Sequence, residues 1–202
     1  MWSTIAAERG ALADDLAGLT ESQWDTTSLC TRWSVRDVLA HLTGAASLTP
    51  VTFVKEIAGA RFDFDRFADR RIAKHRGGSP TETLENFRAK QHSTSSPPGP
   101  KLTWLGETLV HAEDIRRPLG IQHSYPTDAV RELMDFYKSS NTLIGTKSRI
   151  AGVTLLATDT DWTHGSGPRA EGPIASLMMV GTGRHEALAE LTGDGVEVLR
   201  GR

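Results

Sequence analysis

The sequence of 202 residues contains a single cysteine, Cys30. One cysteine excludes an internal disulfide and any zinc or iron–sulfur site built on several cysteines. An excess of charge of one sign is also lacking, because 23 Lys and Arg residues stand against 25 Asp and Glu residues, for a formal net charge of -2. This balance gives no electrostatic basis for binding nucleic acid or an anionic membrane. We therefore expect neither as a partner.

Long apolar runs are absent as well. No run approaches the ~20 residues that a membrane-spanning helix needs. The N-terminus, Met1–Thr4, shows neither the basic nor the apolar part of a secretory signal. Hydrophobic residues make up 38% and charged residues 24% of the chain, values typical of a globular domain. These observations predict a cytoplasmic protein.

The first two thirds of the chain show helical spacing of apolar residues. One helix is predicted to begin at Ser34, an N-cap residue that has Asp37 three positions later, as in a capping box. Ser79 followed by Pro80 predicts the start of another helix. Further predicted helices cover residues 3–19, 51–75, 102–117 and 127–140.

The composition changes near residue 150. Residues 153–158 are rich in β-branched side chains and predict a strand, and residues 196–199 suggest a final short one. Gly165, Gly167, Pro168 and Gly172 predict a stretch rich in turns. Short helices are expected over 174–180 and 185–191. The predicted organisation is a helical bundle over residues 1–148, followed by a small α/β region over 149–202 packed on that bundle.

Ionisable side chains follow one stripe of the helix predicted over 102–117. Glu107 and His111 are four residues apart, and Asp114 returns to the same stripe seven residues after Glu107. Apolar residues flank this stripe, which argues against a solvated face. A pair at i and i+4 on a helix can present two metal ligands at once.

A third ligand must come from another helix, and His41 is the best candidate. It lies within an apolar helical segment, where a buried imidazole needs a partner. With Glu107 and His111 it makes a His₂Glu set, and three protein ligands with an open position are the pattern of a catalytic zinc site. Nickel or iron would also suit these ligands. The spacing leaves two alternatives open, a satisfied core histidine and an ordinary i,i+4 pair.

Three segments carry a resemblance: residues 33–42 (WSVRDVLAHL), 106–120 (GETLVHAEDIRRPLG) and 181–184 (GTGR). They resemble the mycothiol-dependent maleylpyruvate isomerase family, which belongs to the wider group of DinB-like metal-binding bundles. The resemblance extends over nearly the whole chain. It implies a mainly α fold, a DinB-like four-helix bundle with a small C-terminal α/β element.

The resemblance also implies a function. The metal ligands of the family are a histidine on the second helix and a Glu-x-x-x-His pair on a later one, and His41, Glu107 and His111 fall on those positions. The expected cofactors are a divalent metal, most simply zinc, and mycothiol as the thiol cosubstrate. The metal would deprotonate the thiol, which would attack an electrophilic small molecule for isomerisation or S-transfer. A homodimer is left open.

Three further residues enter the predicted site, each with an alternative. Asp114 would orient a ligand histidine or a water, or would pair with Arg116 or Arg117. Arg184 would meet an acidic substrate, or would be a surface residue. Arg116 would bind polar groups of the cofactor, or would be a solvated arginine.

Two other functions remain open at this stage. One is a metal-dependent hydrolase on the same scaffold, which would need no thiol. The other is a non-catalytic binding or regulatory bundle that retains the ligands without turnover. Cys30 is interpreted as a small buried apolar residue.

Overall fold

The computed structural model describes residues 1–142 and 144–202. The chain divides into two compact units, Met1–His123 and Ser124–Arg202. The boundary predicted after residue 148 lies inside the second unit, because the helix over 127–137 packs on C-terminal elements. Within the described ranges, no helix combines the length and the apolar character that crossing a membrane requires.

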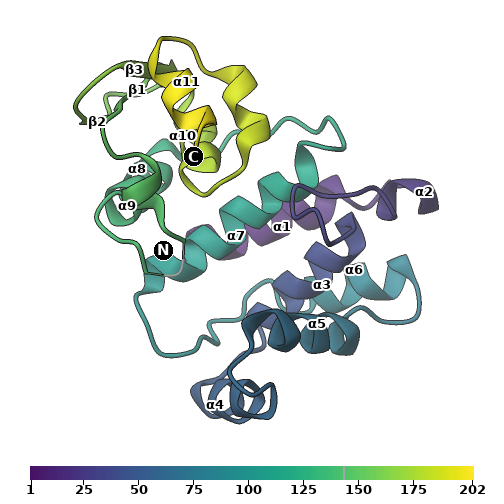
Figure 1. The fold of residues 1–202 in the computed structure, drawn as a ribbon. Coiled ribbons are helices and arrows are strands. Elements are labelled where there is room, and N and C mark those ends of the chain that lie inside the picture. The colour runs from purple at the N-terminus through teal and green to yellow at the C-terminus, as the bar shows by residue number, and fades with distance from the viewer. Residues whose placement is uncertain (143) are drawn as a thin grey trace. The chain divides into compact units, whose positions relative to one another are not determined.

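The first unit is helical. Four of its helices contact one another in a ring, in the order α1, α7, α3 and α6, and α5 packs on α3 (Figure 1). Buried apolar side chains of α1, α3, α6 and α7 form one core. The helices are α1 (Trp2–Asp15), α2 (Glu21–Trp24), α3 (Val35–Ala45), α4 (Pro50–Gly59), α5 (Phe64–His75), α6 (Pro80–Arg88) and α7 (Lys101–Arg116).

The predicted capping signals are confirmed. Ser34 accepts a hydrogen bond from the backbone of Asp37, whose carboxylate accepts one from the backbone of Ser34, as a capping box requires. Ser79 caps α6, and Pro80 opens it. The single helix expected over 51–75 is wrong. Two residues in the left-handed region, Arg61 and Phe62, each with φ 60°, separate α4 from α5.

The second unit combines short helices with a sheet in the order β2–β1–β3, in which β1 is antiparallel to β2 and parallel to β3. Helix α10, in which every residue except Ala175 is buried, packs on α8, β1 and η1. The elements are α8 (Thr127–Tyr137), α9 (Thr146–Arg149), β1 (Thr154–Ala157), β2 (Thr163–Gly165), β3 (Arg169–Gly172), α10 (Ile174–Gly181), the 3₁₀ helix η1 (His185–Glu190) and α11 (Gly195–Arg200).

Two expectations for this unit are corrected. The strand expected over 196–199 is part of α11, because Val196 and Leu199 are three residues apart and bury the same helix face. The glycine-rich stretch after residue 160 was expected to form turns, yet it supplies β2 and β3. Gly165 ends β2 at φ 93°, where an added Cβ would lie 2.2 Å from the carbonyl oxygen of Val153. Glycine therefore permits the close pairing that its usual strand propensity argues against.

Candidate metal centre

Helix α3 positions His41. Its buried residues Val35, Val38, Leu39 and Leu42 recur at helical spacing and hold one face of the helix in the core. His41 lies beside that face, and its side chain is about one fifth exposed, at 19%. The imidazole therefore stands at the border of the core, where α3 contacts α7.

Helix α7 supplies Glu107 and His111 one turn apart. This helix is buried on most sides, because α1 and α3 both pack on it. The side chains of Glu107 and His111 keep 25% and 14% of their surface exposed. A carboxylate and an imidazole in such surroundings need polar or charged partners.

The three predicted ligands converge. Nε2 of His41 and Oε1 of Glu107 are 2.6 Å apart, and Nε2 of His111 is 3.8 Å from the same oxygen. All three ligand atoms lie within 4.8 Å of one another. Zinc ligands about 2.1 Å from a tetrahedral ion are about 3.4 Å apart. The donor types and their spacing therefore fit a divalent ion held by two helices.

The site carries excess negative charge around His111. Burial acts to lower the pKa of this imidazole, but the Glu107 carboxylate and the contacts with Asp114 and Cys30 outweigh it and raise the pKa to about 10. Two carboxylates thus favour a cation at this position. The same negative charge would stabilise a bound divalent ion.

Asp114 lies behind His111, one of the three predicted ligands. Its side chain is fully buried, and Oδ2 is 2.8 Å from Nδ1 of His111. Of the two arginines named as alternative partners, Arg117 donates to Glu113 at 2.7 Å and Arg116 donates to Asp15 at 2.8 Å. This geometry supports the orienting role of Asp114, which stays a prediction.

The two predicted arginines occupy different settings. Arg116 is fully buried beside Asp15, so the alternative of a solvated surface arginine is wrong. Arg184 belongs to the second unit, where its guanidinium donates to the carbonyl of Thr182 at 3.0 Å. Their roles toward cofactor and substrate stay predictions.

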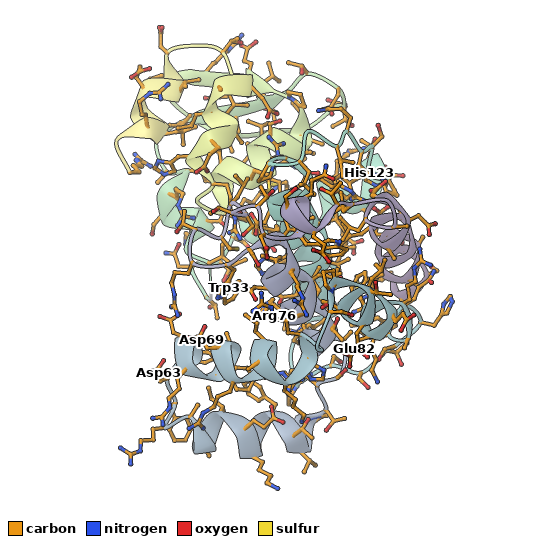
Figure 2. All side chains as sticks on the ribbon, turned by 90° about the vertical axis from the view of Figure 1, so that its right-hand side faces the viewer. Trp33, Asp63, Asp69, Arg76, Glu82 and His123 are labelled. Atoms are coloured by element: carbon orange, nitrogen blue, oxygen red, sulfur yellow. The ribbon has the colours of Figure 1, made fainter. Side chains whose placement is uncertain are left out.

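Sequence reasoning missed two residues of the loop before α3. The indole ring of Trp33 lies 4.9 Å from the imidazole of His41, centroid to centroid. Its Nε1 donates to Asp69 of α5 at 3.4 Å, and Figure 2 labels both residues. The thiol of Cys30 lies 3.0 Å from Asp114. Neither follows a helical period with the ligands, so no spacing signal could have found them.

Arg9 of α1 was missed as well. Its guanidinium is buried, donates to the carbonyl of Ser93 at 2.9 Å, and interacts electrostatically with Glu107. Burial lowers the pKa of Arg9 to about 10, and the Glu107 carboxylate acts in the opposite direction. The charge of Arg9 therefore interacts with that of Glu107, while its guanidinium hydrogen-bonds to the backbone of residue 93.

Comparisons with known proteins agree with the resemblance seen in the sequence. Residues 5–96 match the family described as "Mycothiol maleylpyruvate isomerase N-terminal domain". The fold is similar to a crystal structure of a histidine-to-alanine mutant of the mycothiol-dependent maleylpyruvate isomerase, with a TM-score of 0.63 and 13% identity over 96% of this chain and 91% of that chain. No curated protein matches the chain. The predicted mainly helical, DinB-like fold class is confirmed.

Proposed function

We propose, from the match of residues 5–96 to the mycothiol maleylpyruvate isomerase N-terminal domain, that this protein is a metal-dependent enzyme that activates a low-molecular-weight thiol. The ligands would be His41, Glu107 and His111. One observation carries the proposal: side chains from two helices bring three ligand atoms within 4.8 Å of one another, with a buried carboxylate behind one ligand. The metal would be zinc, and the thiol mycothiol.

Each side chain has a defined task in this proposal. His41 and His111 offer Nε2 lone pairs, and Glu107 offers a carboxylate oxygen. The carboxylate of Asp114 accepts a hydrogen bond from Nδ1–H of His111, which fixes the tautomer that leaves Nε2 free to bind metal. Trp33 covers His41 on one side and limits access of water there.

A divalent ion held by His41, Glu107 and His111 would lower the pKa of a coordinating thiol, which is ~8.5 in free form, and would favour its thiolate. The thiolate sulfur would add to an unsaturated carbon, which breaks the π bond and moves its electron pair onto the conjugated acceptor group, or would displace halide from a halogenated carbon. Loss of the thiol after rotation about the substrate bond gives isomerisation, and its retention gives S-transfer.

Metal content tests the site. Protein purified without chelator or His-tag is analysed for bound elements beside His41→Ala/His111→Ala. We expect about one equivalent of metal in the native protein and none in the double variant. The matched control is His92→Ala/His185→Ala, which removes two exposed histidines and should keep the metal. Metal-free native protein, or equal metal in both double variants, contradicts the proposed ligand set.

Thiol dependence tests the chemistry. Turnover of electrophilic candidate substrates, among them maleylpyruvate, is followed with and without mycothiol. We expect turnover only when both metal and mycothiol are present. Turnover with metal but without any thiol would instead identify a hydrolase. Bound metal with neither thiol binding nor turnover would favour the non-catalytic alternative.

A further inference from the structure

The loop before α3 is fastened to α7 at the level of Asp114. The backbone N–H of Leu29 donates to the carbonyl of Asp114 at 3.1 Å. Within the loop, the hydroxyl of Ser28 donates to the carbonyl of Trp33 at 2.8 Å and accepts from the backbone of Cys30 at 3.1 Å. Cys30 therefore has a defined position against α7, although it lies 84 residues from Asp114 in the sequence.

The thiol of Cys30 faces the polar side of the site. Sγ is 3.0 Å from Oδ2 of Asp114 and 3.6 Å from Nδ1 of His111. The same Oδ2 is 2.8 Å from that Nδ1. One carboxylate oxygen thus stands between two donors, an imidazole N–H and a thiol S–H. A small apolar side chain at position 30 would fill similar space without offering the second donor.

We propose that Cys30 is a positioning residue of the metal centre, whose thiol holds the Asp114 carboxylate in the orientation that fixes the ring of His111. This inference rests on the proposed function. A fully buried carboxylate is costly unless donors satisfy it. With the thiol present, Oδ2 stays directed toward Nδ1, and Nε2 of His111 keeps its direction toward Glu107.

The geometry separates this role from direct ligation in the proposed set. Cys30 faces Nδ1 of His111, whereas Glu107 faces Nε2. The two ring nitrogens point in different directions, so Sγ and the Glu107 carboxylate lie at opposite sides of the His111 ring. Cys30, His111 and Asp114 also form a group of metal-binding types within 4.8 Å of one another. Ligation by the thiol is therefore the outcome against which the proposal must be tested.

The first experiment is the infrared S–H stretching band. The single cysteine makes this band unique in the protein. We expect the native protein to show the band at lower frequency than the urea-unfolded chain, because a donated S–H bond is weakened. A band at the same frequency in both states overturns the proposal. This measurement needs no metal, so it decides the hydrogen bond even if the proposed metal site fails.

The second experiment is metal affinity by competition with a chelator. Loss of a direct partner of a ligand histidine costs 10- to 100-fold in affinity. Cys30 is one hydrogen bond further from the metal than Asp114, and a thiol is a weak donor. We therefore expect Cys30→Ala to bind metal about threefold to tenfold less tightly. Cys30→Ser should restore most of it, because a hydroxyl also donates. Equal affinity in the native protein and Cys30→Ala overturns the inference and leaves the proposed function intact.

Two controls complete the test. Ser28→Ala removes the hydrogen bonds that the Ser28 hydroxyl makes within the same loop but keeps the thiol, and we expect it to bind metal more tightly than Cys30→Ala. If it loses as much affinity as Cys30→Ala, loop order alone explains the effect and the proposal is wrong. In the cobalt-loaded protein, a sulfur-to-cobalt charge-transfer band that disappears in Cys30→Ala would make the thiol a ligand, which also overturns the proposal.

Discussion

Replacement of Asp114 by Asn is the sharpest test of how the metal centre is held. The variant keeps the size of the side chain and removes its charge. Asp114 is fully buried and lies 2.8 Å from Nδ1 of His111. The bond to an ionised carboxylate is about twice as strong as the bond to a neutral amide.

The expected magnitude follows from this position. An outer partner of a ligand histidine typically contributes 10- to 100-fold to metal affinity, or about 1.4 to 2.7 kcal/mol. Because Asp114 is shielded from solvent, we expect Asp114→Asn to fall toward the upper end of this range. A surface carboxylate would contribute far less, since water screens its charge.

The assay is a chelator-competition titration of the metal-free protein. The matched control is Glu113→Gln, an adjacent buried carboxylate of α7 that pairs with Arg117 at 2.7 Å. This control should keep native affinity, and circular dichroism should show the same helix content in both variants. Native affinity in Asp114→Asn, or an equal loss in Glu113→Gln, would refute the reasoning.

The remaining predictions concern stability. Burial and neighbouring cations lower the pKa of His75 from 6.5 to about 4. As the pH falls from 6.5 toward 4, the imidazole is protonated in the unfolded chain before it is protonated in the folded protein, so the free energy of unfolding decreases. Urea titrations over this pH range should show a smaller decrease for His75→Gln. Gly165→Ala should lower the melting temperature strongly, because its Cβ would meet the carbonyl of Val153 at 2.2 Å, whereas Gly18→Ala has open space and should change it little. Leu39→Ala, at a fully buried site, should cost about 3 to 5 kcal/mol in urea unfolding, and a loss below ~1 kcal/mol would contradict the assigned core.

The sequence was sufficient for features that depend on short-range patterns. Helix starts at Ser34 and Ser79 follow from the hydrogen bonds that their own side chains make. The pairing of Glu107 and His111 follows from the period of a single helix. Prediction from the sequence failed where local propensity and tertiary context disagree. Residues 196–199 are the example, because their apolar pattern fits both a strand and one helix face.

The tertiary structure alone decided what surrounds the three proposed metal ligands. His41 and Glu107 are 66 residues apart in the chain, and only the packing of α3 on α7 brings their atoms to 2.6 Å. The burial of Asp114 and the approach of Cys30 depend on a loop held by its own hydrogen bonds. No periodicity encodes such a loop, because its position results from contacts between residues distant in sequence. Residue types and helical spacing therefore indicated the ligand set, and long-range packing determined its outer partners.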